Sequence, residues 1–304
     1  MHRAALGLVL GLLAACSPYR PPTRADIPLV WGLRWDADSR PDSADLAALH
    51  AIGARHLLIE LPVASGPHGL PVLLMPDSTA WRGLRKQLTA SPWRLSLALY
   101  ASPTRPLFTE PAPPDRWLDH LGQELTNRLL PQLAGLPLDR LVVGIDWRPL
   151  EPYAQPWQRL TDRLRRELAA RFPQPVALTY GADARRLDRS SLWGSFDEIG
   201  LVYPPQESRS PTELRRQHRQ ADSLCAAWGK PLFVVQANLI GPRKAEELEA
   251  RLSFWSDSLP HRGLTLNTIY PRSTWADSNP WFGGAADSQF QVRVRHLLRS
   301  QQGH

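Results

Sequence analysis

The repeating unit of the fold is visible in residues 139–180, which read DRLVVGIDWRPLEPYAQPWQRLTDRLRRELAARFPQPVALTY. An apolar run, Leu141–Asp146, is followed by an amphipathic stretch that opens at Gln155-Pro156. The apolar positions of that stretch share one helix face: Leu160, Leu164 and Leu168. A second apolar run, Val176–Tyr180, comes next. Short apolar runs are typical of parallel strands, and a proline in the first turn is typical of a helix start. The stretch therefore predicts a strand, a helix and a second, parallel strand.

The same alternation extends through residues 29–304. The expected strands are Leu29–Trp35, His56–Leu61, Arg94–Tyr100, Leu141–Asp146, Val176–Tyr180, Glu198–Tyr203, Leu232–Gln236 and Leu264–Ile269. Further helices are expected from Ser43, from Pro114-Asp115, from Ser210-Pro211 and over Ser288–Arg299. Eight strand–helix units predict an α/β fold of the (β/α)8 TIM-barrel type, in a single domain. The sequence contains no G-x-G-x-x-G or Walker motif, which disfavours a nucleotide-binding fold.

The first residues are typical of a processing signal rather than of a folded element. Basic His2 and Arg3 precede twelve apolar residues, too few to span a bilayer, and the run ends in Leu13-Ala14-Ala15-Cys16. This pattern resembles a lipobox and predicts a lipoprotein signal peptide over residues 1–15, acylation of Cys16, and a proline-rich tether over residues 16–28. Ser17 favours the outer membrane in a Gram-negative host, whereas a Gram-positive host would display the protein on its surface. The alternative is an ordinary signal peptide with Cys16 incidental.

The net charge and the cysteine content limit which partners and cofactors are expected. The net charge is +7, but the arginines are scattered along helical patterns, which is typical of solvated helix faces. No nucleic-acid-binding module accompanies them, so no nucleic-acid partner is expected. The second cysteine, Cys225, lies in a helical pattern and is interpreted as a buried apolar residue. With no cysteine–histidine spacing typical of metal sites, neither a metal nor a cofactor is expected.

The expected site lies at the carboxyl ends of the strands, where TIM barrels carry their functional residues. Carboxylates, amides and aromatic rings gather there: Asp36, Glu60, Tyr100, Trp147, Tyr180, Asp183, Tyr203, Asn238 and Trp275. Aromatic rings stack on the apolar faces of sugars, and carboxylates and amides match paired hydroxyls, so a carbohydrate is the predicted ligand. For Trp147 and Trp275 packing is an equally good interpretation, and Glu60 is equally well interpreted as a buried structural acid.

From Trp31 to about Ile240 the chain resembles the β-mannanase-like barrels of glycoside hydrolase family 113. The match is densest from Asp139 to Pro205, through Gly144-Ile-Asp146, Leu178-Thr-Tyr180 and the segment Leu192–Tyr203. Lys230-Pro231 then resembles the start of the strand that leads to the second catalytic carboxylate. The resemblance implies a retaining glycosidase fold, a β-linked mannose- or glucose-type ligand, and catalytic positions at Asp146 and Gln236.

Both catalytic positions depart from the family, which has glutamate at each. Asp146 is one methylene shorter than the general acid/base, and Gln236 cannot serve as a carboxylate nucleophile. The favoured hypothesis is therefore an envelope lipoprotein that binds a glycan without retaining hydrolysis. The alternative is an active, inverting hydrolase with Asp146 as acid and one of three carboxylates as base: Asp36, Glu60 or Asp183. A third hypothesis is a structural lipoprotein without a sugar site.

Overall fold

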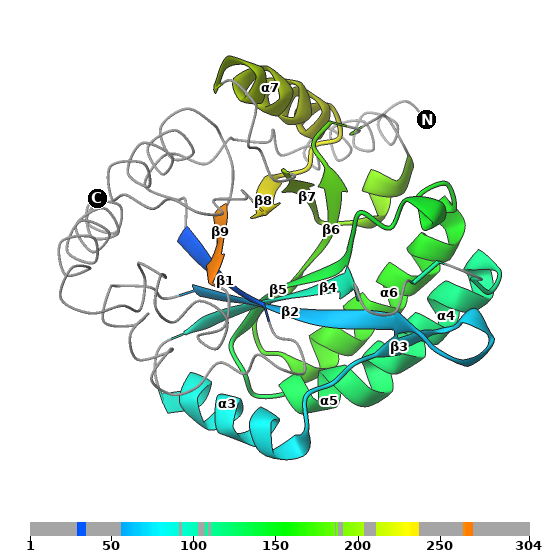
Figure 1. The fold of residues 1–304 in the computed structure, drawn as a ribbon, viewed down its shortest axis with the longest axis vertical. Coiled ribbons are helices and arrows are strands. Elements are labelled where there is room, and N and C mark those ends of the chain that lie inside the picture. Colours follow the sequence, from blue (N-terminus) through cyan, green and yellow to red (C-terminus); the bar gives the residue numbers. More distant parts are fainter. Residues whose placement is uncertain are drawn as a thin grey trace, which may run out of the picture.

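Eight parallel strands close into a ring, which confirms the predicted (β/α)8 fold (Figure 1). The computed structural model describes residues 29–34, 56–90, 93–102, 107–108, 111–185, 187, 191–203, 211–236 and 264–269. The strands are β1 (Leu29–Arg34), β2 (His56–Ser65), β3 (Pro71–Leu73), β4 (Arg94–Ala101), β5 (Leu138–Ile145), β6 (Ala177–Asp183), β7 (Glu198–Val202), β8 (Leu232–Gln236) and β9 (Leu264–Ile269). Around the ring they follow chain order, with β3 outside it, and the pairing of β1 with both β2 and β9 closes the circle.

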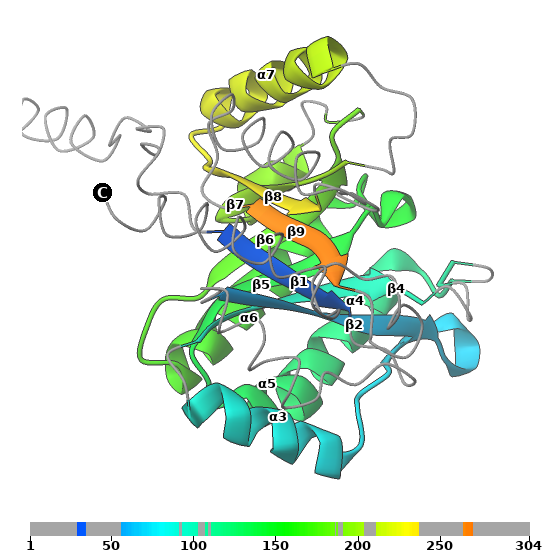
Figure 2. The same ribbon diagram turned by 60° about the vertical axis from the view of Figure 1, so that its left-hand side comes forward.

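The helices lie outside the ring of strands (Figures 1 and 2). They are α3 (Ser78–Ala90), α4 (Pro114–Glu124), α5 (Leu130–Leu133), α6 (Ala154–Arg171) and α7 (Pro211–Ala227). A π-helical turn, η3 (Leu125–Leu129), joins α4 to α5, and three short 3-10 turns are η2 (Pro67–Gly69), η4 (Arg148–Leu150) and η5 (Ser191–Ser195). In the part of the chain with described structure, no helix is long and apolar enough to cross a bilayer.

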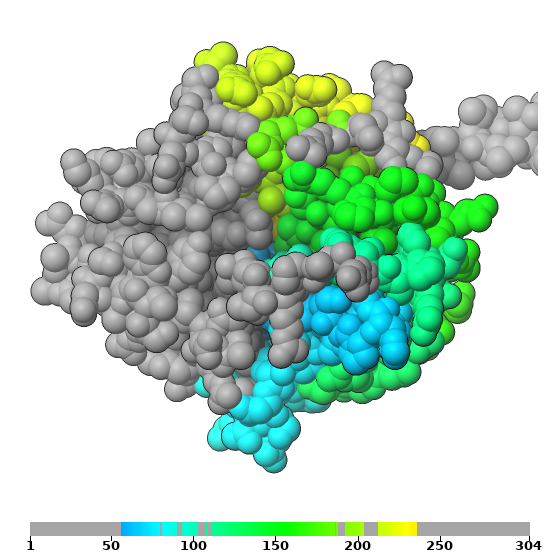
Figure 3. Space-filling model, turned by 45° about the vertical axis from the view of Figure 1, so that its right-hand side comes forward, coloured from blue at the N-terminus to red at the C-terminus, as the bar shows by residue number. Residues whose placement is uncertain are grey.

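Each of the eight predicted strands overlaps an observed one, and the helices predicted at Pro114, Gln155 and Pro211 are present. The helices predicted from Ser43 and over Ser288–Arg299 lie outside the described residues. Besides α5 and the short turns, the sequence did not predict α3 or the antiparallel hairpin that β2 forms with β3. Figure 3 shows this hairpin, in blue, beside the teal and green surface that α4 and α6 form.

Alternation along the strands separates two apolar clusters. The smaller one contains strand residues only: Leu58, Ala98, Val142, Val202, Phe233 and Val235, with Ile145 packed against it. It fills the inside of the ring. The larger cluster joins the outward-facing strand residues, such as Leu57 and Ile59, to the apolar faces of the helices. A side chain at the end of a strand therefore faces either the lumen or the helix layer, according to its position in the alternation.

A buried ion pair crosses the lumen between β5 and β7. Arg140 Nε lies 2.5 Å from Glu198 Oε2, and Nη2 donates to Oε1 at 3.2 Å. Thr179 of β6 donates to Glu198 at 3.1 Å, and Ser96 of β4 accepts from Arg140 at 3.3 Å. The guanidinium carbon lies 3.7 Å from the centre of the Phe233 ring on β8. One ionic group thereby links five consecutive strands of the ring.

Replacing Arg140 alone should be more damaging than replacing the whole pair. Arg140→Met leaves the Glu198 carboxylate buried without its counter-charge, which typically costs about 3–5 kcal/mol, whereas an apolar replacement of both partners is often close to neutral. We expect the Arg140→Met/Glu198→Leu double variant to have a higher free energy of unfolding than Arg140→Met in denaturant titrations. A double variant as unstable as the single one would show that the pair is not the source of the loss.

The first residue of β2 gives the fold a pH dependence. Burial lowers the pKa of His56 to about 4, the charges of Arg94 and Arg140 act in the same direction, and Asp139 opposes them. In the unfolded chain the pKa returns to about 6.5. The neutral imidazole thus contributes its full stability above about pH 6.5, and that contribution is lost as the pH falls toward 4.

We expect the unfolding free energy to drop by up to about 3 kcal/mol more in the native protein than in His56→Gln between pH 7 and pH 4. The matched control is His120→Gln on α4, which should keep the native slope. Parallel slopes for the native protein and His56→Gln would contradict this assignment.

Candidate functional site

Three of the predicted site residues belong to the lumen side of the strands. Glu60 lies two positions after Leu58 on β2, and Tyr100 lies two positions after Ala98 on β4; Leu58 and Ala98 are both members of the lumen cluster. Asp183 ends β6, in the same alternation as Thr179, which bonds to the lumen carboxylate of Glu198. All three side chains are buried. Tyr100 and Asp183 lie at the carboxyl ends of their strands, as expected for a TIM-barrel site, whereas Glu60 is the fifth of the ten residues of β2.

Three other predicted residues face the helix layer instead. Trp147, Tyr180 and Tyr203 are each 0% exposed. The Trp147 ring packs against Trp117, with ring centres 5.3 Å apart, and stacks near Trp157 at 6.5 Å. Here the packing interpretation of Trp147 is the one that the geometry supports. Gly144 is part of this packing, because a Cβ there would lie 2.7 Å from the indole ring.

The two tyrosines are held by hydrogen bonds behind the strands. The Tyr180 hydroxyl donates to Glu151 at 2.8 Å, and the Tyr203 hydroxyl lies 2.6 Å from Nδ1 of His218 on α7. Burial raises the pKa of both phenols well above the usual value. Because their rings point away from the lumen, the expected contact of Tyr180 and Tyr203 with a ligand at the mouth does not form in this arrangement.

Several predicted residues cannot be placed. Asp36, Asn238, Trp275 and Cys16 lie outside the described residues. Gln236 is the last residue of β8, opposite Val202 of β7, and only its backbone is described.

Asp146 is the residue on which the chemistry of the site depends. It follows β5 directly, after a register irregularity between Val142 and Ile145, and its φ of 54° lies in the left-handed region. Irregular strand ends re-aim side chains, and aspartate tolerates this backbone region better than most residues. The Asp146 N–H donates to the Gly181 carbonyl at 2.7 Å, which fixes the turn against β6.

The Asp146 carboxylate begins a chain of alternating charges across the mouth. Arg148 donates to it through Nε at 2.8 Å and through Nη2 at 2.6 Å. Arg148 Nη2 also lies 3.7 Å from the Asp183 carboxylate. Asp183 in turn accepts hydrogen bonds from the side chain of Arg185 and, at 2.9 Å, from its backbone N–H. We call Asp146, Arg148, Asp183 and Arg185 the mouth charge chain.

Sequence reasoning missed the two arginines, although a signal for them exists. Asp146-Trp-Arg148 and Asp183-Ala-Arg185 repeat one pattern, Asp-x-Arg, at the ends of two neighbouring strands. Such a spacing lets the arginine turn back onto the aspartate two residues earlier, which both pairs do.

The pKa shifts of the residues in the mouth charge chain follow from these contacts. Burial alone would raise the pKa of Asp183, but the hydrogen bonds from Arg185 and the charges of Arg185 and Arg148 outweigh it and lower that pKa. The hydrogen bond to Asp146 raises the pKa of Arg148, and the one to Asp183 raises the pKa of Arg185. Asp183 is therefore an ionised and weakly basic carboxylate.

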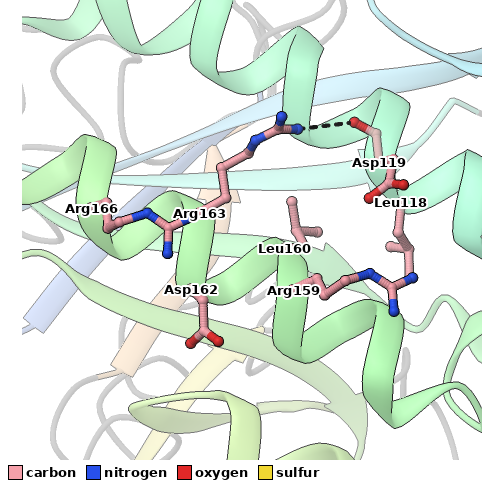
Figure 4. Close-up of a pocket in the computed structure, with 7 residues that line it drawn as sticks. All are labelled: Leu118, Asp119, Arg159, Leu160, Asp162, Arg163 and Arg166. Atoms are coloured by element: carbon pink, nitrogen blue, oxygen red, sulfur yellow. Dashed lines mark hydrogen bonds between the residues drawn. The ribbon is translucent and has the colours of Figure 1, made fainter.

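A hollow of about 320 Å³ lies on the outer helix layer between α4 and α6 (Figure 4). Charged side chains surround a floor of Leu118 and Leu160: Asp119, Arg159, Asp162, Arg163 and Arg166. Arg159 pairs with Asp115, and Arg163 donates to the Asp119 carbonyl at 3.4 Å. Asp162 pairs with Arg165, so several of these charges have partners on α4 or α6 themselves. The hollow is a seam between these two helices. Among the described residues there is also no cluster of three or more metal-ligating side chains.

Comparison with known proteins places the fold. No family model matches the sequence. The threonylcarbamoyl-AMP synthase of Escherichia coli O1:K1 is 29% identical over 143 residues, which cover 46% of this chain and 64% of that protein. The chain thus spans less than two thirds of the curated relative that it matches, and this partial match does not carry that activity over.

Two solved structures agree with the barrel over nearly the whole chain. The family 113 β-mannanase of Alicyclobacillus acidocaldarius, in complex with ManMIm, has a TM-score of 0.64 at 12% identity and covers 92% of this chain and 100% of its own. A xylanase–α-amylase inhibitor protein in complex with trehalose has a TM-score of 0.53 at 16% identity and covers 88% and 97%. The chain has the fold of the family 113 β-mannanases.

Proposed function

We propose that this protein is an envelope-anchored, glycoside-hydrolase-like lipoprotein that binds an oligosaccharide or polysaccharide at the mouth of the barrel without retaining hydrolysis. The observation that carries the proposal is the state of Asp146. It occupies the strand end where the resemblance locates the general acid/base, and both of its oxygens accept hydrogen bonds from Arg148. A carboxyl group that protonates a leaving oxygen must first be released from such a pair.

The second carboxylate of a retaining mechanism is also replaced. That mechanism requires a nucleophile that forms a glycosyl–enzyme bond, about 5–5.5 Å from the acid. Gln236 ends β8 at the corresponding strand, and an amide cannot form that intermediate. An amide does donate and accept hydrogen bonds, so this position remains compatible with sugar binding.

Inversion with Asp183 as the base fits the geometry poorly. One nitrogen of Arg148 lies 2.6 Å from an Asp146 oxygen and 3.7 Å from an Asp183 oxygen. The guanidinium thus contacts both carboxylates, whereas inversion needs an attacking water between carboxyl groups roughly 6.5–9.5 Å apart. The remaining candidate base among the described residues is Glu60, a buried acid on the lumen side of β2, and it is the observation that favours the alternative of an inverting hydrolase.

Two structural neighbours support the proposal that this barrel binds a sugar, whether or not it hydrolyses one. One is a β-mannanase in complex with ManMIm, and another is named an inhibitor protein and is in complex with trehalose. A barrel of this shape thus occurs in a protein that is not named as a hydrolase and that still holds a sugar.

The functional proposal is tested by reducing-end release from β-mannans, β-glucans and peptidoglycan fragments, together with calorimetric binding. The processed protein in detergent should bind at least one of these glycans and release no reducing ends. Asp146→Glu/Gln236→Glu puts glutamate at both positions and should show turnover, because the double-displacement groups are then present. Gln123→Glu on the exposed face of α4 is the matched control and should remain inactive. Turnover by the native protein that disappears in Asp146→Asn would establish a hydrolase instead.

The anchor is proposed from the sequence alone: a signal peptide over residues 1–15, a lipid on Cys16, a tether over residues 16–28 and the barrel domain over residues 29–304. We expect cells that express the protein to incorporate an alkyne-tagged palmitate into it and to retain it in the membrane fraction, the outer membrane in a Gram-negative host. Cys16→Ser should abolish labelling, and Cys225→Ser should leave it unchanged. Equal labelling of the native protein and Cys16→Ser would contradict the anchor.

A further inference from the structure

The two arginines of the mouth charge chain are arranged alike. Each uses Nε and Nη2 to hold the aspartate two residues before it. Among the residues that the structure describes, the Nη1 group of Arg148 and that of Arg185 make no hydrogen bond. Two strand ends thus each present a guanidinium that is anchored to an aspartate along one edge.

The two arginines are also the more exposed residues of the mouth charge chain. The side chains of Arg148 and Arg185 are 40% and 38% exposed, whereas Asp183 is 4% exposed. The Asp146 carboxylate is 32% exposed, but both of its oxygens are already engaged. A ligand that enters the mouth therefore meets guanidinium donors, with the carboxylates behind them. Because the aspartates already restrict the arginine side chains, binding loses less side-chain entropy than it would with free ones.

We propose that the glycan bound at this mouth is acidic and that Arg148 and Arg185 recognise the carboxylate of a uronic acid unit. This inference rests on the proposed function, since it names the class of ligand for the same mouth. The planar guanidinium matches a carboxylate better than it matches a single hydroxyl, and charge-assisted bonds are about twice as strong as neutral ones. The net charge of +7 favours the approach of a polyanionic glycan at long range.

The proposal departs from the neutral mannose- or glucose-type polymer that the family resemblance implies. The mouth charge chain contains two carboxylates and two guanidiniums, so its net charge is zero. Selectivity for an acidic glycan therefore comes from the orientation of the donors rather than from an excess of positive charge. That distinction can be tested, because a surface arginine elsewhere contributes the same net charge without the orientation.

The test compares two hexasaccharides that differ only at C6. β-1,4-linked mannohexaose carries hydroxymethyl groups, and β-1,4-linked hexamannuronate carries carboxylates on the same backbone. With the processed protein in detergent, calorimetry should give at least about tenfold tighter binding of the hexamannuronate, the scale of one hydrogen bond to a charged group. The preference should shrink as sodium chloride is raised, because exposed charges are screened.

Variants separate oriented recognition from general attraction. Arg148→Gln and Arg185→Gln should each remove most of the preference. Arg185→Lys should keep only part of it, because lysine keeps the charge but cannot hold Asp183 with one edge and present an oriented donor with another. Arg166→Gln on the outer face of α6 makes the same change in net charge and should keep the preference. Far-ultraviolet circular dichroism checks that each variant is folded.

The outcomes separate this inference from the proposed function. Binding of mannohexaose as tight as that of hexamannuronate would overturn the acidic ligand and leave glycan binding standing. An equal loss of preference in Arg166→Gln and Arg185→Gln would overturn recognition by the mouth arginines. Failure of every glycan to bind the native protein would overturn the proposed function and this inference with it.

Discussion

The pair of Arg140 and Glu198 defines what the inside of this barrel can contain. A ring of eight strands has a lumen just wide enough for side chains. Here an ionic group with its own hydrogen-bond partners crosses that lumen between β5 and β7. Arg140 and Glu198 lie near the amino-terminal ends of β5 and β7. A ligand is therefore expected at the opposite end of the ring, at the carboxyl ends of the strands.

Strand alternation then decides which residues reach that mouth. The strand positions that face the lumen include Glu60, Tyr100 and Asp183. Tyr180 occupies a position that faces outward, and its hydroxyl donates to Glu151 outside the ring. Trp147 and Tyr203 follow the ends of their strands and turn into the helix layer, where aromatic packing stabilises the barrel wall. The described lumen side of the mouth thus carries Glu60, Tyr100 and Asp183, whereas the rings of Trp147, Tyr180 and Tyr203 form part of the core.

Much of the architecture could be predicted from the sequence, since the apolar runs that form the strands are dictated by burial on both faces of the sheet. The side-chain directions at strand ends could not, because a single irregular position, such as the one before Asp146, shifts the phase of all that follows. The β2–β3 hairpin escaped notice because Pro62 lies within the run that extends β2. The contacts of Arg148 and Arg185 could not be predicted, because they depend on the backbone turn that follows β5 and β6 and folds each arginine back onto its aspartate.

The mouth charge chain bears on the choice between binding and catalysis. Catalysis requires groups that change partners as charge develops in the transition state, and a carboxylate with both oxygens bonded to a guanidinium is stabilised in the ground state instead. At Asp146 the backbone N–H fixes the strand end against β6, and the separate hydrogen bonds from Arg148 to the carboxylate oppose proton transfer. A rigid, satisfied network of this kind suits a receptor, whose ligand must find the same arrangement of donors at each encounter. The proposed receptor role therefore rests on two features that act in the same direction: Asp146 and Gln236 at the positions where the resemblance implies glutamates, and an arginine bonded to each of the aspartates that end β5 and β6.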